Sequence, residues 1–176
     1  MTIPPGRPEA DEFAPSFADY VGRVPETDPV QAMRLQIDET AALLGRVVES
    51  AANARYAAGK WSVKEVVGHL ADTERIMAYR ALRIARGDQT PLAGFDENAY
   101  VPVAHFDRRT LKDLVAELRD VRHASVRLFE YLDTAAWKRR GTAGEKPISV
   151  RALAFIIPGH ERHHVEVLRT RYGLSG

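Results

Sequence analysis

Residues 159–165 read Gly-His-Glu-Arg-His-His-Val and hold three of the six histidines of this 176-residue chain. His160 and His164 are four residues apart, so on a helix they lie on one face, one turn apart. The helical spacing continues on both sides through apolar residues, namely Leu153, Ile157, Val167 and Leu168. The stretch therefore predicts a helix from Ser149 to just before Gly173, with two histidines on its buried face.

Three further amphipathic helices are predicted upstream of this stretch. Asp28 as N-cap and Pro29 at the first helical position begin the first of them. Ser62 and Glu65 form a capping box at the start of the second, and the third is predicted over residues 110–132. Four such helices without an alternating strand pattern predict an all-α protein, a four-helix bundle.

A long connection, residues 88–109, separates the second and third predicted helices after Gly87 as a left-handed helix stop. Such a crossover allows two successive helices to lie parallel, and long loops in compact domains are commonly functional. Six of the ten prolines lie in residues 1–29, where they fix φ and remove backbone donors. We therefore expect an extended arm over residues 1–28 and the bundle domain over residues 29–176.

Composition excludes several classes of function. Twenty-five Lys and Arg against 24 Asp and Glu leave a net charge of +1, which provides no field for nucleic acid or an anionic membrane. The absence of cysteine excludes disulfides, thiolate metal ligands and a cysteine nucleophile. No signal peptide or transmembrane stretch is recognisable, so a cytoplasmic location is expected.

The histidine pair predicts a metal ion. Two imidazoles on a core face would leave polar nitrogens unsatisfied and would not both protonate readily, whereas a shared cation resolves both problems. The alternative is that His160 and His164 are surface residues at a helix end. His69 is the candidate third ligand, because it alone among the other histidines occupies a core-facing position of a predicted helix. A lone histidine at such a position is otherwise usually just hydrogen-bonded.

The remaining histidines fit a metal site less well. His163 lies at the edge of the shared face and is expected either behind the ligands or at the surface, while His105 and His123 are expected in solvent. The stretch also matches the zinc-protease pattern H-E-x-x-H, in which the glutamate polarises a water. Glu161 is expected to point away from the histidine face into solvent, and the third protease ligand would have to come from a short remaining tail, so a protease is disfavoured.

These residues resemble those of a known family. Trp61-Ser62 with Glu65, residues 69–75 reading His-Leu-Ala-Asp-Thr-Glu-Arg, and the 160–164 cluster are similar to the DinB/YfiT-like superfamily of metal-binding four-helix bundles. The resemblance runs from about residue 30 to residue 172. It implies His69, His160 and His164 as ligands of a divalent ion, often zinc or nickel, with open coordination positions. It also implies a homodimer, and some members use low-molecular-weight thiols in S-transfer or isomerisation.

The predicted function follows from such a site. A three-histidine ion with an open position would lower the pKa of bound water from about 15.7 toward ~7, or deprotonate a thiol. We therefore expect a metal-dependent hydrolase or a low-molecular-weight-thiol S-transferase that acts on a small molecule. The alternative is a non-catalytic, stress-related module that binds metal or a small ligand. The number of ligands separates the two functions, because a structural zinc site would be closed by four protein ligands.

Two polar residues near His69 have two interpretations each. Asp72 either orients the free N–H of a ligand and accepts a proton, or forms a surface ion pair with Arg75 at i,i+3 spacing. Arg80 either holds an anionic group of the substrate, or extends its guanidinium into solvent.

Overall fold

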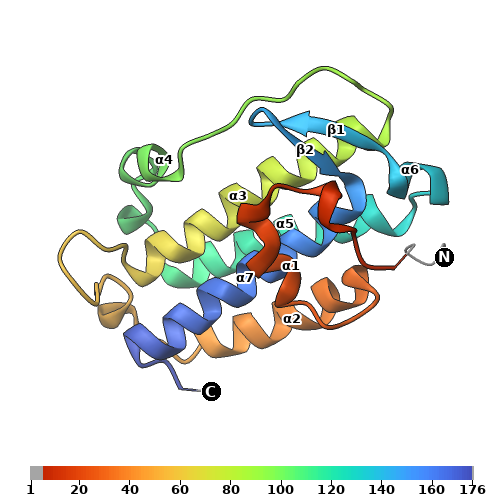
Figure 1. Ribbon diagram of the computed structural model, residues 1–176. Coiled ribbons are helices and arrows are strands. Elements are labelled where there is room, and N and C mark those ends of the chain that lie inside the picture. The colour runs from red at the N-terminus through yellow and green to blue at the C-terminus, as the bar shows by residue number, and fades with distance from the viewer. Residues whose placement is uncertain (1–5, 176) are drawn as a thin grey trace.

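Four long helices form the body of the protein in a computed structural model that describes residues 6–175 (Figure 1). They are α2 (Pro29–Leu44), α3 (Val63–Ala85), α5 (Leu111–Glu130) and α7 (Val150–Tyr172). Both α2 and α3 pack against α5 and α7. The predicted all-α four-helix bundle is confirmed.

The long crossover sets the directions of the helices. After α3 the chain returns along the outside of the bundle to the end at which α3 begins, so that α3 and α5 run in the same direction (Figure 1). Helices α2 and α7 run the opposite way. The crossover also contains α4 (Glu97–Ala104) and the short 3-10 helix η4 (Phe106–Arg108), which the sequence pattern had not predicted. A further 3-10 turn, η3 (Glu49–Ala51), lies between α2 and α3.

Local hydrogen bonds fix the starts of the long helices as predicted. The Ser62 and Glu65 side chains each accept from the other's backbone N–H, at 3.2 and 2.6 Å, which completes the capping box of α3. Asp28, Thr110 and Ser149 cap α2, α5 and α7 in the same way, each accepting from a backbone N–H two or three residues later. Since each cap involves neighbouring residues only, these helix starts can be predicted from the sequence.

A short hairpin, which the sequence pattern had not predicted, is attached to the bundle. A short helix, α6 (Thr134–Lys138), leads into an antiparallel hairpin of β1 (Arg140–Ala143) and β2 (Lys146–Ser149). The turn residues Gly144 and Glu145 both have positive φ, as a two-residue hairpin turn of this kind requires. Four-residue strands carry too little alternation to be recognised, and the turn lacks the Asn-Gly or Asp-Gly pair that marks such hairpins.

The N-terminal segment, residues 6–28, is packed on the bundle and contains helical turns where extended backbone was predicted. These are η1 (Ala10–Glu12), η2 (Pro15–Phe17) and α1 (Ala18–Gly22), which lies against α7. Pro15 occupies the first position of η2, where no backbone donor is needed. Glu12 is buried and accepts a hydrogen bond from Ser149 Oγ at 2.6 Å. The domain boundary at residue 28 stays a prediction.

The core falls into two apolar clusters. One joins the hairpin end of α7 to α2, α5 and α6, with Met33, Phe129, Trp137 and Phe155 fully buried; the other joins the start of α3 to α5 and the crossover. Across residues 6–175, no helix combines the length and the apolar character needed to span a membrane. His69 on α3 and His160 on α7 are both buried within this packed body.

Gly159→Ala is expected to destabilise the protein by about 1–3 kcal/mol, a typical range for overpacking. The added Cβ would lie 1.9 Å from the carbonyl oxygen of Tyr20, so α1 and α7 would have to separate. Urea unfolding measures the effect. Gly22→Ala is the matched control, because its Cβ would meet nothing within 4 Å, and it should be at least as stable as wild type. Equal stability of the two variants would contradict the described packing of α1.

Candidate metal centre

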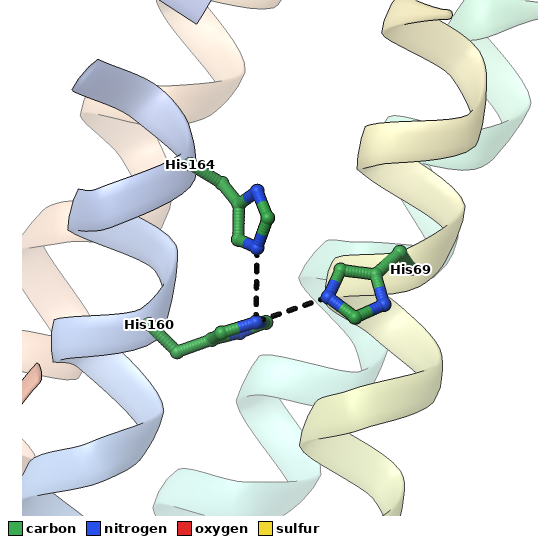
Figure 2. A group of neighbouring side chains, drawn as sticks. All are labelled: His69, His160 and His164. Atoms are coloured by element: carbon green, nitrogen blue, oxygen red, sulfur yellow. Dashed lines mark hydrogen bonds between the residues drawn. The ribbon is translucent and has the colours of Figure 1, made fainter. Parts of the chain in front are cut away.

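Three histidines from distant parts of the chain converge between α3 and α7 (Figure 2). The Nε2 atom of His160 lies 3.0 Å from Nε2 of His69 and 3.1 Å from Nε2 of His164. One ring nitrogen of each histidine lies within 4.8 Å of those of the other two. The convergence expected from helix faces is therefore present in the fold.

Each ring is placed by a local feature of its helix. The Ser62 cap sets the phase of α3, which directs His69 toward α7. His69 Nδ1 lies 3.3 Å from Thr73 Oγ1, one turn further on, and a proton shared on that side leaves the Nε2 lone pair facing inward. His160 and His164 are one turn apart on α7, so both rings face the same gap.

Burial keeps the three imidazoles neutral. Burial lowers the pKa of His69 to about 4, and burial together with the neighbouring histidines lowers the pKa of His164 to about 3. The pKa of His160 is also well below its usual range, first because of burial and then because of His164 and His69. A neutral imidazole presents a lone pair, which is the form that binds a metal ion.

The donor set fits a divalent ion. Two imidazole nitrogens at 2.0–2.1 Å from a tetrahedral zinc ion lie about 3.3 Å apart, close to the two measured separations. His160 Nε2 faces the other two Nε2 atoms at 3.0 and 3.1 Å, but a ring nitrogen carries either one proton or one lone pair, so both contacts cannot be ordinary hydrogen bonds. Within residues 6–175, no fourth imidazole or carboxylate joins the group.

A cavity of about 440 Å³ opens beside the three histidines. Aromatic rings flank them: the Trp61 ring centre lies 4.6 Å from that of His69, and the Tyr20 ring centre lies 5.3 Å from that of His160. The remaining wall comes from η2, α3, the crossover and the hairpin, and it includes Phe17, Thr73, Met77, Arg80, Phe95, Glu97, Lys146 and Ile148. The three Nε2 atoms are thus reachable from a small-molecule-sized space.

Several of these wall residues were not predicted from the sequence. Tyr20 belongs to the segment expected to be an extended arm, and its contact with His160 depends on that segment folding back onto α7. Trp61 entered the sequence analysis only through the family resemblance, without a role in the site. Gly159, directly before His160, was the one available signal, because a glycine within a buried helix often marks a close backbone approach.

The other predicted site residues are placed as follows. His163 is partly exposed at the edge of the cavity, with its ring centre 5.1 Å from that of His164 and its Nδ1 3.8 Å from Asp19. Asp72 does not line the cavity, and its Oδ1 lies 3.4 Å from Arg75 Nη1, as the ion-pair interpretation requires. Arg80 lines the cavity and is buried, so it does not extend into solvent.

The prediction that Glu161 is solvated is wrong. The residue is 1% exposed, and its Oε2 accepts from Arg122 at 2.6 Å. Arg122 is fully buried and also makes two 2.9 Å contacts to the carboxylate of Glu74. Glu161 is buried because its side chain points into the bundle, where Arg122 of α5 contacts it. Glu161 is committed to Arg122 and does not line the large cavity, unlike the water-polarising glutamate of a zinc protease.

His105 and His123 are exposed, as expected, and take no part in the centre. A sequence profile of the DinB superfamily matches residues 32–168. This chain belongs to the DinB superfamily. The N-terminal segment that carries Tyr20 lies outside the matched range.

Individual relatives agree with this membership of the DinB superfamily. A Bacillus licheniformis protein provisionally named a metal-dependent hydrolase is 35% identical over 117 residues, which span 62% of this chain and 64% of that protein. YfiT from Bacillus subtilis, described as a probable metal-dependent hydrolase with an unusual four-helix bundle topology, superposes with a TM-score of 0.70 at 21% identity. That superposition covers 86% of this chain and 91% of YfiT.

A second solved structure shares the fold at lower identity. The mycothiol-dependent maleylpyruvate isomerase superposes with a TM-score of 0.64 at 13% identity, over 78% of this chain and 58% of the isomerase. At such identities the two structural matches establish the four-helix fold. The chemistry has to be inferred from the residues of the site.

The metal-free protein should lose stability as the pH falls from about 6.5 toward 4. The unfolded histidines bind protons below their ordinary pKa of 6.5, whereas the folded ones resist protonation down to about 4 for His69. The unfolded state then binds more protons, so the free energy of unfolding falls by roughly 1 kcal/mol per buried histidine for each pH unit. Urea unfolding between pH 7 and pH 5, with a chelator present, measures this slope.

His164→Asn should reduce that slope by about one histidine's share, because one buried neutral ring is removed. His123→Asn, at an exposed position, is the matched control and should leave the slope as in wild type. A wild-type stability that stays flat from pH 6.5 to pH 5 would contradict the burial of three neutral imidazoles.

Proposed function

We propose that this DinB-superfamily protein binds one divalent metal ion through His69, His160 and His164 and uses it in a metal-dependent reaction of a small molecule. The observation that carries the proposal is the convergence of three neutral imidazoles beside a cavity of about 440 Å³, with His160 Nε2 lying 3.0 and 3.1 Å from the Nε2 atoms of His69 and His164. Zinc and nickel are the favoured ions, because imidazole suits both and the chain offers no thiolate.

Hydrolysis or thiol transfer is the proposed chemistry. A divalent ion with an open position lowers the pKa of a water or a thiol and so supplies a nucleophile at neutral pH. The names given to the Bacillus licheniformis and Bacillus subtilis relatives support the hydrolase. A thiol reaction would use an external low-molecular-weight thiol, since the chain has no cysteine.

The surrounding residues have supporting roles in this proposal. Thr73 fixes the orientation of the His69 ring from the side away from the ion. The rings of Trp61 and Tyr20 cover His69 and His160, which limits the access of bulk water and strengthens electrostatic interactions in the site. Burial holds all three ligands in the neutral form that binds a cation at neutral pH.

The competing function is a module that binds metal or a small ligand without turnover. A structural zinc site is typically closed by four protein ligands, whereas residues 6–175 supply three. A cavity of about 440 Å³ beside the ligands also falls in the size range of small-molecule sites. Both observations favour chemistry over a purely structural ion.

His69→Ala and His164→Ala are each expected to lower the affinity for zinc by at least about tenfold, because each removes one of three ligands. Elemental analysis of protein loaded with zinc and then desalted should give about one ion per wild-type chain and little in either variant. His123→Ala, which changes an exposed histidine of α5, should keep wild-type metal content. Full metal content in either ligand variant would refute the three-histidine site.

Turnover should depend on the metal. We expect at least one substrate from a panel of esters, amides and thiol conjugates to be consumed by the zinc- or nickel-loaded protein and not by the chelator-treated protein or by His164→Ala. Dependence on an added low-molecular-weight thiol would identify the S-transferase, and turnover without it the hydrolase. Metal binding with no turnover across the panel would favour the module.

A further inference from the structure

Arg80 is a buried cation in the wall of the proposed active-site cavity. It lies on α3, three helical turns after His69, and is only 6% exposed. Its Nη2 donates to the backbone oxygen of Ala93 at 2.7 Å, and its Cζ lies 5.5 Å from the ring centre of Phe95. These contacts hold the guanidinium in place in the cavity wall but do not neutralise its charge.

No carboxylate of residues 6–175 lies within 4.0 Å of the Arg80 guanidinium. Arg122, the other buried arginine in the bundle, shows the contrast, because Glu74 and Glu161 both contact its guanidinium. A buried charge without a counter-ion is unfavourable, and burial accordingly lowers the pKa of Arg80. The fold therefore keeps an unneutralised cation facing a cavity large enough for a ligand.

The other charged residues of the cavity do not supply the missing partner. Glu97 lines the cavity but contributes to raising the pKa of Tyr20, which places its charge near the Tyr20 side of the site. Lys146, on the hairpin, adds a second cation to the wall and is exposed. The charge of the wall therefore suits an anion that enters with the ligand.

The position of Arg80 also limits the shape of that ligand. Eleven residues of helix separate its Cα from that of His69, or about 16 Å. Helical side chains lean toward the N-terminus, and the 3.7 Å contact of Arg80 Nη1 with Met77 Sδ shows that this one does. Thr73 and Met77 line the cavity between the two ends. A ligand that reaches from the guanidinium to the histidines must be elongated, on the order of 10 Å.

We propose that the cavity takes an elongated small molecule with a carboxylate at one end, which pairs with Arg80, and its reacting group at the histidine end. A carboxylate matches the planar guanidinium fork, and its single charge matches the single unneutralised buried cation. Met77 would pack on the apolar middle section of the ligand, with the ring of Phe95 near the carboxylate end and the rings of Trp61 and Tyr20 near the reacting end. The placement of the reacting group at the histidines rests on the proposed metal function, whereas the pairing of the carboxylate with Arg80 needs no metal.

The test uses chelator-treated protein and two probes of equal length, 4-phenylbutyrate and the uncharged 4-phenylbutan-1-ol. Calorimetric titration at pH 7.5 should show the acid binding wild type at least about tenfold more tightly than the alcohol, as one charge-assisted bidentate pair predicts. Arg80→Gln should raise the Kd of the acid to that of the alcohol and leave the Kd of the alcohol unchanged. Arg83→Gln, on the same helix but paired with Asp88, is the matched control and should behave as wild type.

Equal affinities of wild type for acid and alcohol, no binding of either, or an acid preference that survives Arg80→Gln would each overturn this assignment. Loss of the preference in Lys146→Gln but not in Arg80→Gln would overturn it as well. Arg80→Lys, which keeps the charge but not the fork, should keep a reduced preference and serves if the glutamine variant fails to fold. Zinc content separates the two proposals: if the acid preference is retained while zinc does not bind, only the metal function fails.

Discussion

The packing of α3 against α7 is the contact on which the rest of the structure depends. It removes three imidazoles from water and sets their Nε2 atoms 3.0–3.1 Å apart around His160. Without a cation this arrangement is unfavourable, because it leaves lone pairs facing one another and prevents protonation. The same burial keeps all three rings neutral, which is the form that can bind a divalent ion. The arrangement that lowers the stability of the metal-free protein therefore also forms the candidate metal site.

The rest of the bundle supports that contact. Helix α2 and the N-terminal segment cover α7 from the other side, where Gly159 allows the backbone of Tyr20 to approach. Beneath the histidines, Arg122 is held by two carboxylates, so this buried charge is neutralised within the fold. Arg80 is left without such a partner and faces the cavity. The Arg122 guanidinium thus links helices of the bundle, and the Arg80 guanidinium is available to a ligand.

Much of this arrangement was predictable because it rests on local signals. Helix ends follow from caps such as Ser62 with Glu65, and the pairing of His69 with the α7 histidines follows from helical periodicity. The predictions failed where tertiary contacts determine the position of a residue or segment. Glu161 was assigned to solvent because it lies away from the histidine face, but its side chain points into the bundle and contacts Arg122 of α5. The contact of Tyr20 with His160 and the pairing of the two four-residue strands depend on segments that fold back on other parts of the chain. The spacing of residues alone does not predict such contacts.

X-ray absorption at the zinc edge of the zinc-loaded protein tests the central claim most directly, since it reports the number and type of atoms around the ion. We expect three imidazole nitrogens at about 2.0 Å and at least one further light-atom ligand from outside the chain. A spectrum with fewer than three imidazoles around the ion would contradict the convergence of α3 and α7 on a shared metal.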